Sequence, residues 1–219
     1  MSVAEYIEHT NLSPVLTISD IDRLVDEARR YRFFGICVPP FWVKRAQREI
    51  GIDRIALVTV AGFPLGYSMT ETKLDELKRA IDNGADEVDL VWNLTAFKTG
   101  LPWTKVEIAK CSNLAHHHGK LLKVIIETCY LSSQEIVEAC KLCTEAGADF
   151  IKTSTGFGAA GASVENIELM KKVLPPQVGI KASGGVKTLA TAEALIRAGA
   201  DRIGTSSGVS IITATKAKV

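Results

Sequence analysis

Three segments of this chain repeat the tripeptide Gly-Ala-Asp, each time directly before a short apolar run. They are NGADEVDLV at 83–91, AGADFIKTS at 146–154 and AGADRIGTS at 198–206. A glycine in this place is typical of a helix end, and the apolar run after it is typical of a buried strand. The same order is expected at Gly35 and Gly119, so predicted strands recur at intervals of roughly 20 to 35 residues, which is one βα unit.

The spacing of these boundaries predicts eight strands that alternate with helices. Most are nearly continuous apolar runs rich in β-branched residues, as expected for parallel strands covered on both faces. Their expected ranges are 6–10, 35–39, 56–62, 87–92, 121–127, 150–154, 178–182 and 202–206. Eight βα units in a chain of 219 residues favour a closed (β/α)8 TIM barrel over a doubly wound sheet. No Pro- or Ser-rich linker divides the chain, so residues 1–219 are expected to form a single domain.

The charge balance excludes functions that depend on a strong overall field. With 26 basic and 25 acidic residues the formal net charge is +1, so neither nucleic acid nor a membrane is an expected partner. The N-terminal segment MSVAEYIEH lacks the basic and apolar regions of a secretion signal. A cytoplasmic location is therefore expected, and an odd count of five cysteines fits reduced thiols there.

Two short motifs invite a metal-binding interpretation. Cys140 and Cys143 form a C-x-x-C, but they lie in EIVEACKLCTEAG, which has the apolar spacing of an amphipathic helix and no second ligand pair. The histidines at 116–118 precede Gly119, where basic side chains suit the negative end of a helix dipole. Neither a metal nor another cofactor is expected.

Ionisable side chains stand inside four predicted apolar strands, where a charge costs several kcal/mol unless it is paired or used. They are Asp89 in EVDLV, Lys123 in LLKVIIE, Lys152 in FIKTST and Lys181 in VGIKAS. Because successive side chains on a strand point to opposite faces, Lys152 is expected to face the barrel axis while Ile151 faces the helices. Lys152 also stands near the C-terminal end of its strand, where barrel enzymes build their active sites.

Lysines on two neighbouring strands suggest that their proximity is used chemically. An unperturbed lysine, with a pKa of about 10.4, is almost fully protonated at neutral pH and is a poor nucleophile. Two like charges about 4 Å apart repel by about 4 kcal/mol at an effective dielectric of about 20, which corresponds to about three pKa units. One amine of the pair is therefore expected to be neutral, although this argument does not decide which. The structural alternative is that the lysines pair with strand carboxylates, namely Glu87, Asp89 and Glu127.

Turns of small residues follow the last three predicted strands, with STGFG at 154–158, SGGVK at 183–187 and GTSSGV at 204–209. Backbone N–H groups can close on an anion only where no side chain intervenes, and phosphate sites of barrels lie after strands 7 and 8. The residues that fall there are Gly184, Gly185, Ser206 and Ser207, with Lys187 as a further charge. The sequence therefore predicts a phosphate site at this end of the barrel.

The chain resembles the deoxyribose-phosphate aldolase family along almost its whole length. The matching segments are YIEHTNL, GICVPP, VAGFPLG, ADEVDLV, KVIIET, GADFIKTSTGF, IKASGGV and IGTSS. The most specific of these are FIKTSTGF and IKASGGV, which follow each other on consecutive predicted strands. The resemblance implies a Schiff-base (class I) aldolase that reversibly cleaves 2-deoxy-D-ribose 5-phosphate to D-glyceraldehyde 3-phosphate and acetaldehyde, in deoxyribose phosphate catabolism.

The resemblance also implies roles for individual residues. Lys152 matches the Schiff-base lysine, Lys181 matches the lysine that makes it less basic, and Asp89 matches the carboxylate that moves protons through an ordered water. The positions that match phosphate-binding residues are Gly156, Gly184, Gly185, Ser206 and Ser207. The positions that match the lining of the sugar pocket are Thr155 and Cys37. For Lys123, a site role and a structural ion pair both stay open.

The sequence departs from the family pattern in three places. Glu8 stands where some members have Asp, and Phe157 stands where some members have Lys. Many members end in a tail with a tyrosine that aids proton transfer, whereas this sequence has no tyrosine after Tyr130. A slower proton-transfer step than in the tailed members is therefore expected.

Two alternatives stay open at this point. Another Schiff-base barrel, transaldolase-like or fructose-bisphosphate-aldolase-like, would use the same lysine but would need more polar groups near the substrate than GICVPP and VAGFPLG offer. A barrel that only binds a sugar phosphate would not need a neutral amine. The expected partners are a sugar phosphate and an aldehyde, and a homodimer is expected because the short N-terminus covers little of the barrel bottom.

Overall fold

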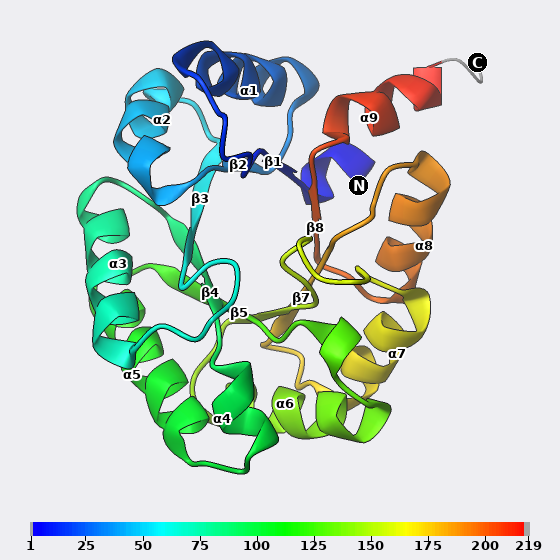
Figure 1. The fold of residues 1–219 in the computed structure, drawn as a ribbon. Helices are drawn as coiled ribbons and strands as arrows, with labels where there is room; N and C mark the ends of the chain where they lie inside the picture. Colours follow the sequence, from blue (N-terminus) through cyan, green and yellow to red (C-terminus); the bar gives the residue numbers. More distant parts are fainter. Residues whose placement is uncertain (1, 217–219) are drawn as a thin grey trace.

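The computed structural model describes residues 2–216, in which eight parallel strands close into a barrel in the order of the sequence. Figure 1 looks along the barrel axis, with the strands at the centre and the helices around them. The strands are β1 Ile7–Thr10, β2 Gly35–Cys37, β3 Ala56–Ala61, β4 Glu87–Val91, β5 Leu121–Ile125, β6 Phe150–Lys152, β7 Gly179–Ser183 and β8 Arg202–Thr205. The barrel closes between β1 and β8, where Glu8 lies beside Gly204. The predicted (β/α)8 barrel is confirmed.

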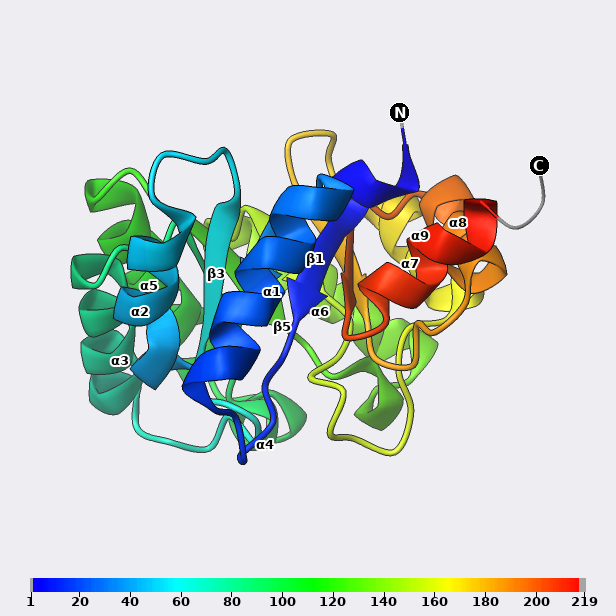
Figure 2. The ribbon, with the colours of Figure 1, turned by 90° about the horizontal axis from the view of Figure 1, so that it is seen from above.

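Helices cover the outside of the barrel (Figure 1 and Figure 2). They are α1 Ile18–Tyr31, α2 Val43–Ile50, α3 Thr70–Asp82, α4 Leu94–Lys98, α5 Trp103–His117, α6 Ser133–Glu145, α7 Val164–Val173, α8 Leu189–Ala198 and α9 Gly208–Lys216. Short 3-10 helices occur at η1 Val3–Tyr6, η2 Pro40–Trp42 and η3 Thr128–Tyr130. In the side view of Figure 2, the loops after β3 and β6 leave the lower edge of the barrel. Among the described residues, no helix combines the length and apolar character needed to cross a bilayer.

The repeated Gly-Ala-Asp tripeptide has a structural role at the N-terminal ends of the strands. Each aspartate accepts a hydrogen bond from a backbone N–H of the preceding strand and donates its own N–H to the carbonyl of the same residue. The pairs are Asp86 with Leu57, Asp149 with Leu122 and Asp201 with Ile180. These carboxylate bonds are 2.8 to 3.0 Å long. The tripeptide therefore ends a helix and also joins the next strand to its neighbour.

Asp149→Ala should test this role, because it leaves the N–H of Leu122 without its carboxylate acceptor. We expect the free energy of unfolding to fall by about 1 to 3 kcal/mol, as for other buried donors that lose their partner. Urea unfolding measures the change. The control is Asp82→Ala, which removes a carboxylate that pairs with Lys78 on the surface of α3 and should change stability by less than about 0.5 kcal/mol. Equal losses of stability in the two variants would show that the hydrogen bond between Asp149 and the N–H of Leu122 is not needed for the fold.

Most strands end one or two residues before their predicted ends. The apolar run of β5 shows the physical reason. It continues through Ile126, but Glu127 has a left-handed backbone with φ 53°, which no strand residue adopts. In β6, strand-type hydrogen bonding continues one residue past the end of the strand, because the N–H of Thr153 donates to the carbonyl of Lys181 at 3.0 Å. Apolar character thus overestimates strand length where the chain turns into a loop.

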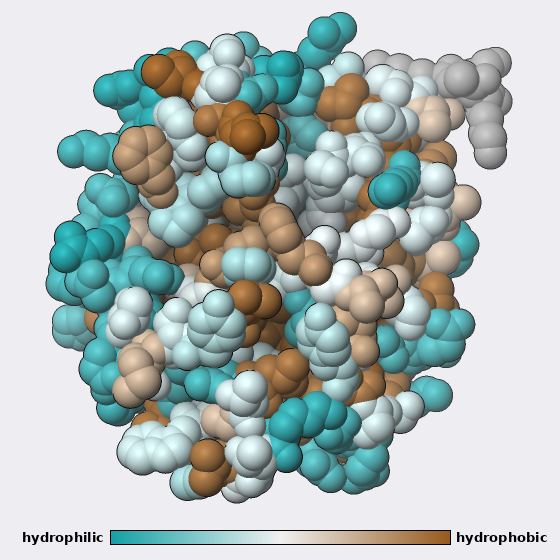
Figure 3. All heavy atoms as spheres, in the orientation of Figure 1, coloured by the Kyte–Doolittle hydropathy of each residue, from teal (hydrophilic) through white to brown (hydrophobic). Residues whose placement is uncertain are grey.

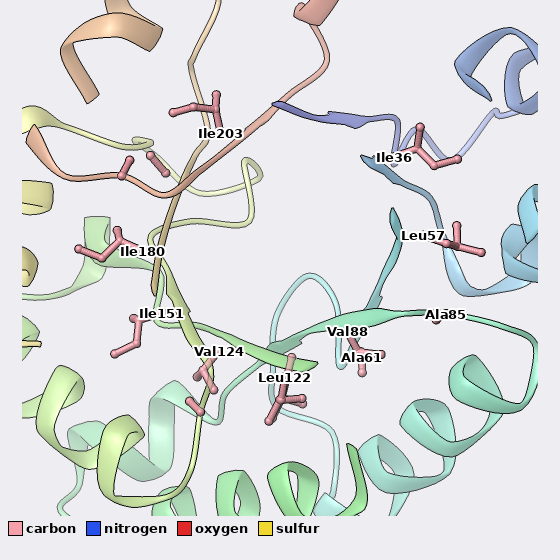
Figure 4. Packing of buried hydrophobic residues seen from close by; sticks show 14 of the residues in the cluster. Ile36, Leu57, Ala61, Ala85, Val88, Leu122, Val124, Ile151, Ile180 and Ile203 are labelled. Carbon is pink, nitrogen blue, oxygen red and sulfur yellow. The ribbon is translucent and has the colours of Figure 1, made fainter. Parts of the chain in front are cut away.

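Alternating strand side chains divide the interior into an apolar layer and a polar centre. The outward side chains pack against the helices, as Figure 4 shows for Ile36, Leu57, Val124, Ile151 and Ile180. The predicted outward direction of Ile151 is confirmed. Four fully buried charged side chains belong to the inner face of the strands, namely Glu8, Asp89, Lys123 and Lys181. The centre of the barrel is therefore ionic while its outer layer is apolar.

An arginine stacked on aromatic rings lies at the N-terminal end of the barrel. The Arg202 guanidinium carbon lies 3.6 Å from the ring centroid of Phe34 and 5.5 Å from that of Phe150. The Phe150 ring fits only because residue 179 is glycine, since a Cβ there would lie 2.2 Å from a ring carbon. This stack fills the barrel where β6 and β8 begin.

The motifs that invited a metal interpretation are structural elements. Cys140 and Cys143 lie on the buried side of α6, and burial raises the pKa of Cys140 to about 12. The predicted histidine segment ends α5, and His116 Nε2 lies 2.9 Å from an Asp149 oxygen. Over residues 2–216, no three His, Cys, Asp or Glu side chains are grouped so that they could hold a metal ion.

Candidate active site

Strand register sets the inward charged side chains beside one another in pairs. Asp89 on β4 is paired with Lys123 on β5, and Lys152 on β6 is paired with Lys181 on β7. Partners in register point to the same face of the sheet, so each pair lies side by side. With Glu8 on β1 they form a charge cluster, which also includes Glu87.

Asp89 is at the centre of the charge cluster. Its Oδ2 atom accepts hydrogen bonds from Lys152 Nζ at 2.9 Å and from Lys181 Nζ at 2.6 Å, while Oδ1 accepts one from Lys123 Nζ at 3.0 Å. Burial alone would raise the pKa of Asp89, but the neighbouring side chains of Lys123, Lys152 and Lys181 outweigh burial and hold that pKa well below its usual range. Because Lys152 and Lys181 share one oxygen atom, their nitrogens are close neighbours.

Lys181 is fully buried between two carboxylates. Besides Asp89 it contacts Glu8, which lies two strands away across the closure of the barrel. The intervening strand carries Gly204, where a Cβ would lie 3.1 Å from Lys181 Cε and would crowd the lysine side chain. Burial alone would lower the pKa of Lys181, but Asp89 and Glu8 outweigh it and raise that pKa, so Lys181 stays an ammonium at neutral pH.

Lys123 lies among three carboxylates and does not reach the cavity described below. In addition to Asp89, its Nζ atom lies 2.5 Å from Glu87 and 3.5 Å from Glu8. Burial would lower its pKa, but these carboxylates outweigh burial and raise it. Ion pairs with Glu87 and Asp89 are thus present, but Glu127, the third carboxylate named from the sequence, forms none with the lysines. The pairing with Glu8 was not predicted, because Glu8 comes from a strand far away in the sequence.

Lys152 is the lysine of the charge cluster that reaches an open cavity. The cavity has a volume of about 380 Å³ and is bounded by the segments that follow β1, β6, β7 and β8. The predicted site residues that line it are Lys152, Thr155, Gly156, Gly184, Gly185, Lys187 and Ser206. Figure 3 shows the face seen in Figure 1, on which apolar residues gather around the centre and hydrophilic ones dominate the left edge.

Glycines give part of the cavity a wall of bare backbone. Gly156, Gly184 and Gly185 have φ values of 89°, 84° and 75°, which favour glycine. A Cβ on Gly184 would lie 2.9 Å from the Cα of Gly161, so the two loops touch through their backbones. Ser206 stands two residues before α9, and helix N-termini favour anions. We call Gly156, Gly184, Gly185, Lys187 and Ser206 the anion cradle.

Two predicted pocket residues do not line the cavity. Cys37 is fully buried among apolar side chains of the barrel interior, and burial raises the pKa of its thiol to about 11, so the thiol stays protonated. Ser207 lies outside the cavity lining, and its backbone N–H donates to Thr205 Oγ1 at 2.9 Å.

The cavity also includes polar residues that were not singled out from the sequence. Asn11 and Ser183 line it. Their place at the C-terminal ends of β1 and β7 was the feature that could have indicated them. Phe157 lines it as well, with its ring packed edge-on against Phe63 at 5.3 Å between centroids. The cavity wall is therefore apolar at position 157, where some proteins of the resembling family have a lysine.

Comparisons with known proteins agree with this architecture. Residues 3–214 match the family model described as DeoC/LacD family aldolase. Deoxyribose-phosphate aldolase of Brevibacillus brevis is 52% identical over 99% of this chain and 97% of its own length, and that of Thermococcus kodakarensis is 51% identical over 96% and 95%. The solved deoxyribose phosphate aldolase of Aeropyrum pernix, described as a tetramer, superposes with a TM-score of 0.92 at 32% identity, covering 99% and 92% of the two chains. The family resemblance seen in the motifs is confirmed, and the chain belongs to the DeoC/LacD family of aldolases.

Proposed function

We propose that this aldolase reversibly cleaves 2-deoxy-D-ribose 5-phosphate to D-glyceraldehyde 3-phosphate and acetaldehyde, through a Schiff base on Lys152. The observation that carries the proposal is that one lysine of a buried charge cluster, Lys152, opens into a cavity whose wall is the anion cradle. A carbonyl carbon at Lys152 and a phosphate at the cradle fit the two ends of one phosphorylated aldehyde. The names of the similar proteins support the choice of the deoxy sugar.

The environments of the two neighbouring lysines support Lys152 as the nucleophile. Lys181 contacts two carboxylates and keeps its proton. Over residues 2–216, Lys152 pairs with the carboxylate of Asp89 alone, and it reaches the cavity. Lys152 is therefore the amine that can add to a carbonyl group.

The reaction follows from this assignment. The neutral amine of Lys152 adds to the C1 aldehyde of the open-chain sugar. The resulting carbinolamine takes up one proton and loses water, which gives a protonated imine. Asp89, acting through a water molecule and with Lys181, takes the C3 hydroxyl proton while the C2–C3 bond breaks and its electron pair moves into the imine. D-glyceraldehyde 3-phosphate leaves, and an enamine remains on Lys152. Protonation of the enamine at C2 and hydrolysis of the imine release acetaldehyde.

A borohydride experiment tests the proposed function. The protein is incubated with 2-deoxy-D-ribose 5-phosphate, reduced, digested and mapped by mass spectrometry. A stable adduct on Lys152 is the expected result, and an adduct on Lys181 would overturn the assignment of the nucleophile. An adduct formed only from more hydroxylated sugar phosphates would replace the proposed substrate. If no adduct forms while the sugar phosphate still binds, the chain is a binding protein and the proposal is wrong.

Lys187 gives a prediction for the anion cradle, because it is the cation of that wall of the cavity. Lys187→Gln is expected to raise KM for the phosphorylated sugar about fivefold, because the variant loses one exposed charge contact with the phosphate. The change in kcat should be small. KM for unphosphorylated 2-deoxy-D-ribose should stay the same. The control is Lys172→Gln on the exposed side of α7. An equal rise in KM for both sugars would show that Lys187 does not contact the phosphate.

We also propose that the chain acts as one domain, as a homodimer and in the cytoplasm. Light scattering during size-exclusion chromatography measures the mass of the assembly. The expectation about a missing tyrosine tail concerns the C-terminus, where residues 217–219 lie outside the described ones.

A further inference from the structure

Glu127 combines unfavourable features that the proposed reaction does not explain. Its side chain is buried, and its backbone is left-handed with φ 53° and ψ 68°, a region that residues with side chains rarely adopt. Within residues 2–216, no basic side chain forms a salt bridge with its carboxylate. A buried carboxylate on a strained backbone and without a counter-ion persists only where the surrounding structure requires it.

The polar contacts of Glu127 fix one residue of the loop that follows Lys152. The backbone N–H of Thr155 donates to its two carboxylate oxygens at 3.2 and 3.1 Å, and the Thr155 hydroxyl donates to one of them. The same loop passes so close that a Cβ on Gly158 would lie 3.3 Å from Glu127 Cδ. Among residues 2–216, the one further polar contact of its carboxylate is with Cys129 Sγ at 4.0 Å. Glu127 therefore determines both where Thr155 lies and where its hydroxyl proton points.

A count of its hydrogen bonds shows what Thr155 can offer to a ligand. A threonine hydroxyl has one proton and two lone pairs. The proton is held by Glu127, and one lone pair accepts the N–H of Phe157 at 3.0 Å. Thr155 lines the cavity that Lys152 reaches. Thr155 can therefore offer a ligand in this cavity its remaining lone pair, as a hydrogen-bond acceptor, and it has no proton left to donate.

We propose that Glu127 is a positioning residue that makes Thr155 an acceptor for a substrate hydroxyl and thereby favours substrates that carry this hydroxyl. The inference rests on the proposed function, in which C1 is bound to Lys152 and the phosphate lies at the anion cradle. Thr155 stands between these two ends, three residues after Lys152 and directly before Gly156 of the cradle.

The hydroxyl concerned follows from the reaction. The C3 hydroxyl gives up its proton during cleavage, so the C4 hydroxyl is the one that donates to Thr155. In the synthetic direction this group is the C2 hydroxyl of D-glyceraldehyde 3-phosphate, the acceptor aldehyde. The contact therefore distinguishes acceptor aldehydes with this hydroxyl from those without it.

Glu127→Gln tests the proposal, because it replaces one carboxylate oxygen with an NH2 group that donates. The Thr155 hydroxyl then accepts from that amide, and its own proton turns toward the ligand. With acetaldehyde as the donor substrate, kcat and KM are measured for D-glyceraldehyde 3-phosphate and for 3-phosphooxypropanal, which lacks the hydroxyl. The preference in kcat/KM for the hydroxylated acceptor should fall about tenfold or more, while kcat/KM for 3-phosphooxypropanal changes less than about threefold.

Control variants separate this role from a structural one. Glu138→Gln makes the same chemical change on the exposed side of α6 and should leave the preference unchanged. Thr155→Val should remove the preference and Thr155→Ser should keep it, and these variants test the proposal even if Glu127→Gln does not fold. In the Thr155→Val background, adding Glu127→Gln should have no further effect on the preference.

The outcomes are distinguishable from those of the proposed function. Borohydride reduction with acetaldehyde alone needs no substrate hydroxyl, so Glu127→Gln should still give an adduct on Lys152. If the wild-type protein formed no adduct with acetaldehyde, the Schiff-base proposal itself would be wrong. An equal loss of kcat/KM for both acceptors in Glu127→Gln, or an unchanged preference in Thr155→Val, would overturn the role of Glu127.

Discussion

Lys152→Met is expected to lower kcat for cleavage of 2-deoxy-D-ribose 5-phosphate by about 10⁴-fold or more, because the variant has no amine to form the imine. Methionine keeps the length and volume of the lysine stem but cannot form the carbon–nitrogen bond. The neighbouring Lys181 does not replace it, because its side chain is fully buried between Asp89 and Glu8 and does not reach the cavity. This should be the largest effect of any single substitution in the protein.

Two measurements accompany the activity assay for Lys152→Met. The variant should give no adduct with borohydride, while it still binds the sugar phosphate because the anion cradle is intact. Lys172→Met, a lysine on the exposed side of α7, is the matched control and should keep wild-type kcat. Residual activity above about 1% of the wild type in Lys152→Met would show that another group forms the covalent intermediate.

Asp89→Asn is expected to lower kcat by about 10³-fold, because it removes the carboxylate that takes the substrate proton. The amine of Lys152 remains, so reduction with acetaldehyde should still trap an adduct while cleavage of the C2–C3 bond is slow. This separation of imine formation from bond cleavage distinguishes a proton-transfer role from general damage to the site. Asp75→Asn on the exposed side of α3 is the control and should keep wild-type activity. Full cleavage activity in Asp89→Asn would contradict the proposed role.

The same substitution should also destabilise the fold. Asp89 is the shared partner of Lys123, Lys152 and Lys181, and removing one partner of a buried ion pair costs about 3 to 5 kcal/mol. The pKa of Asp89 in the folded protein lies below its value in the unfolded chain, so its stabilisation is complete above the unfolded value of about 4. The stability difference between wild type and variant should therefore be constant near neutral pH and shrink as the pH falls below about 4. Urea unfolding at several pH values measures it.

Local sequence patterns predicted the elements of the fold because they reflect local physics. The Gly-Ala-Asp segments located three helix ends and the strands that follow, and alternation along a strand placed Ile151 outward and Lys152 inward. The ends of strands were less accurate, because an apolar run such as β5 continues to Ile126 although the left-handed backbone of Glu127 ends the strand.

The partners of the charged residues were decided by barrel closure and register. The contact of Lys181 with Glu8 joins residues at opposite ends of the chain, and Gly204 on the strand between them adds no side chain that would crowd Lys181. Glu127 was grouped with the lysines as a strand carboxylate, but its backbone directs it to Thr155 instead. The sequence by itself determined which side chains face the barrel axis, since that depends only on the two-residue period of a strand. The tertiary structure decided which of them meet and which one opens into the cavity, because these contacts depend on how eight strands close upon one another.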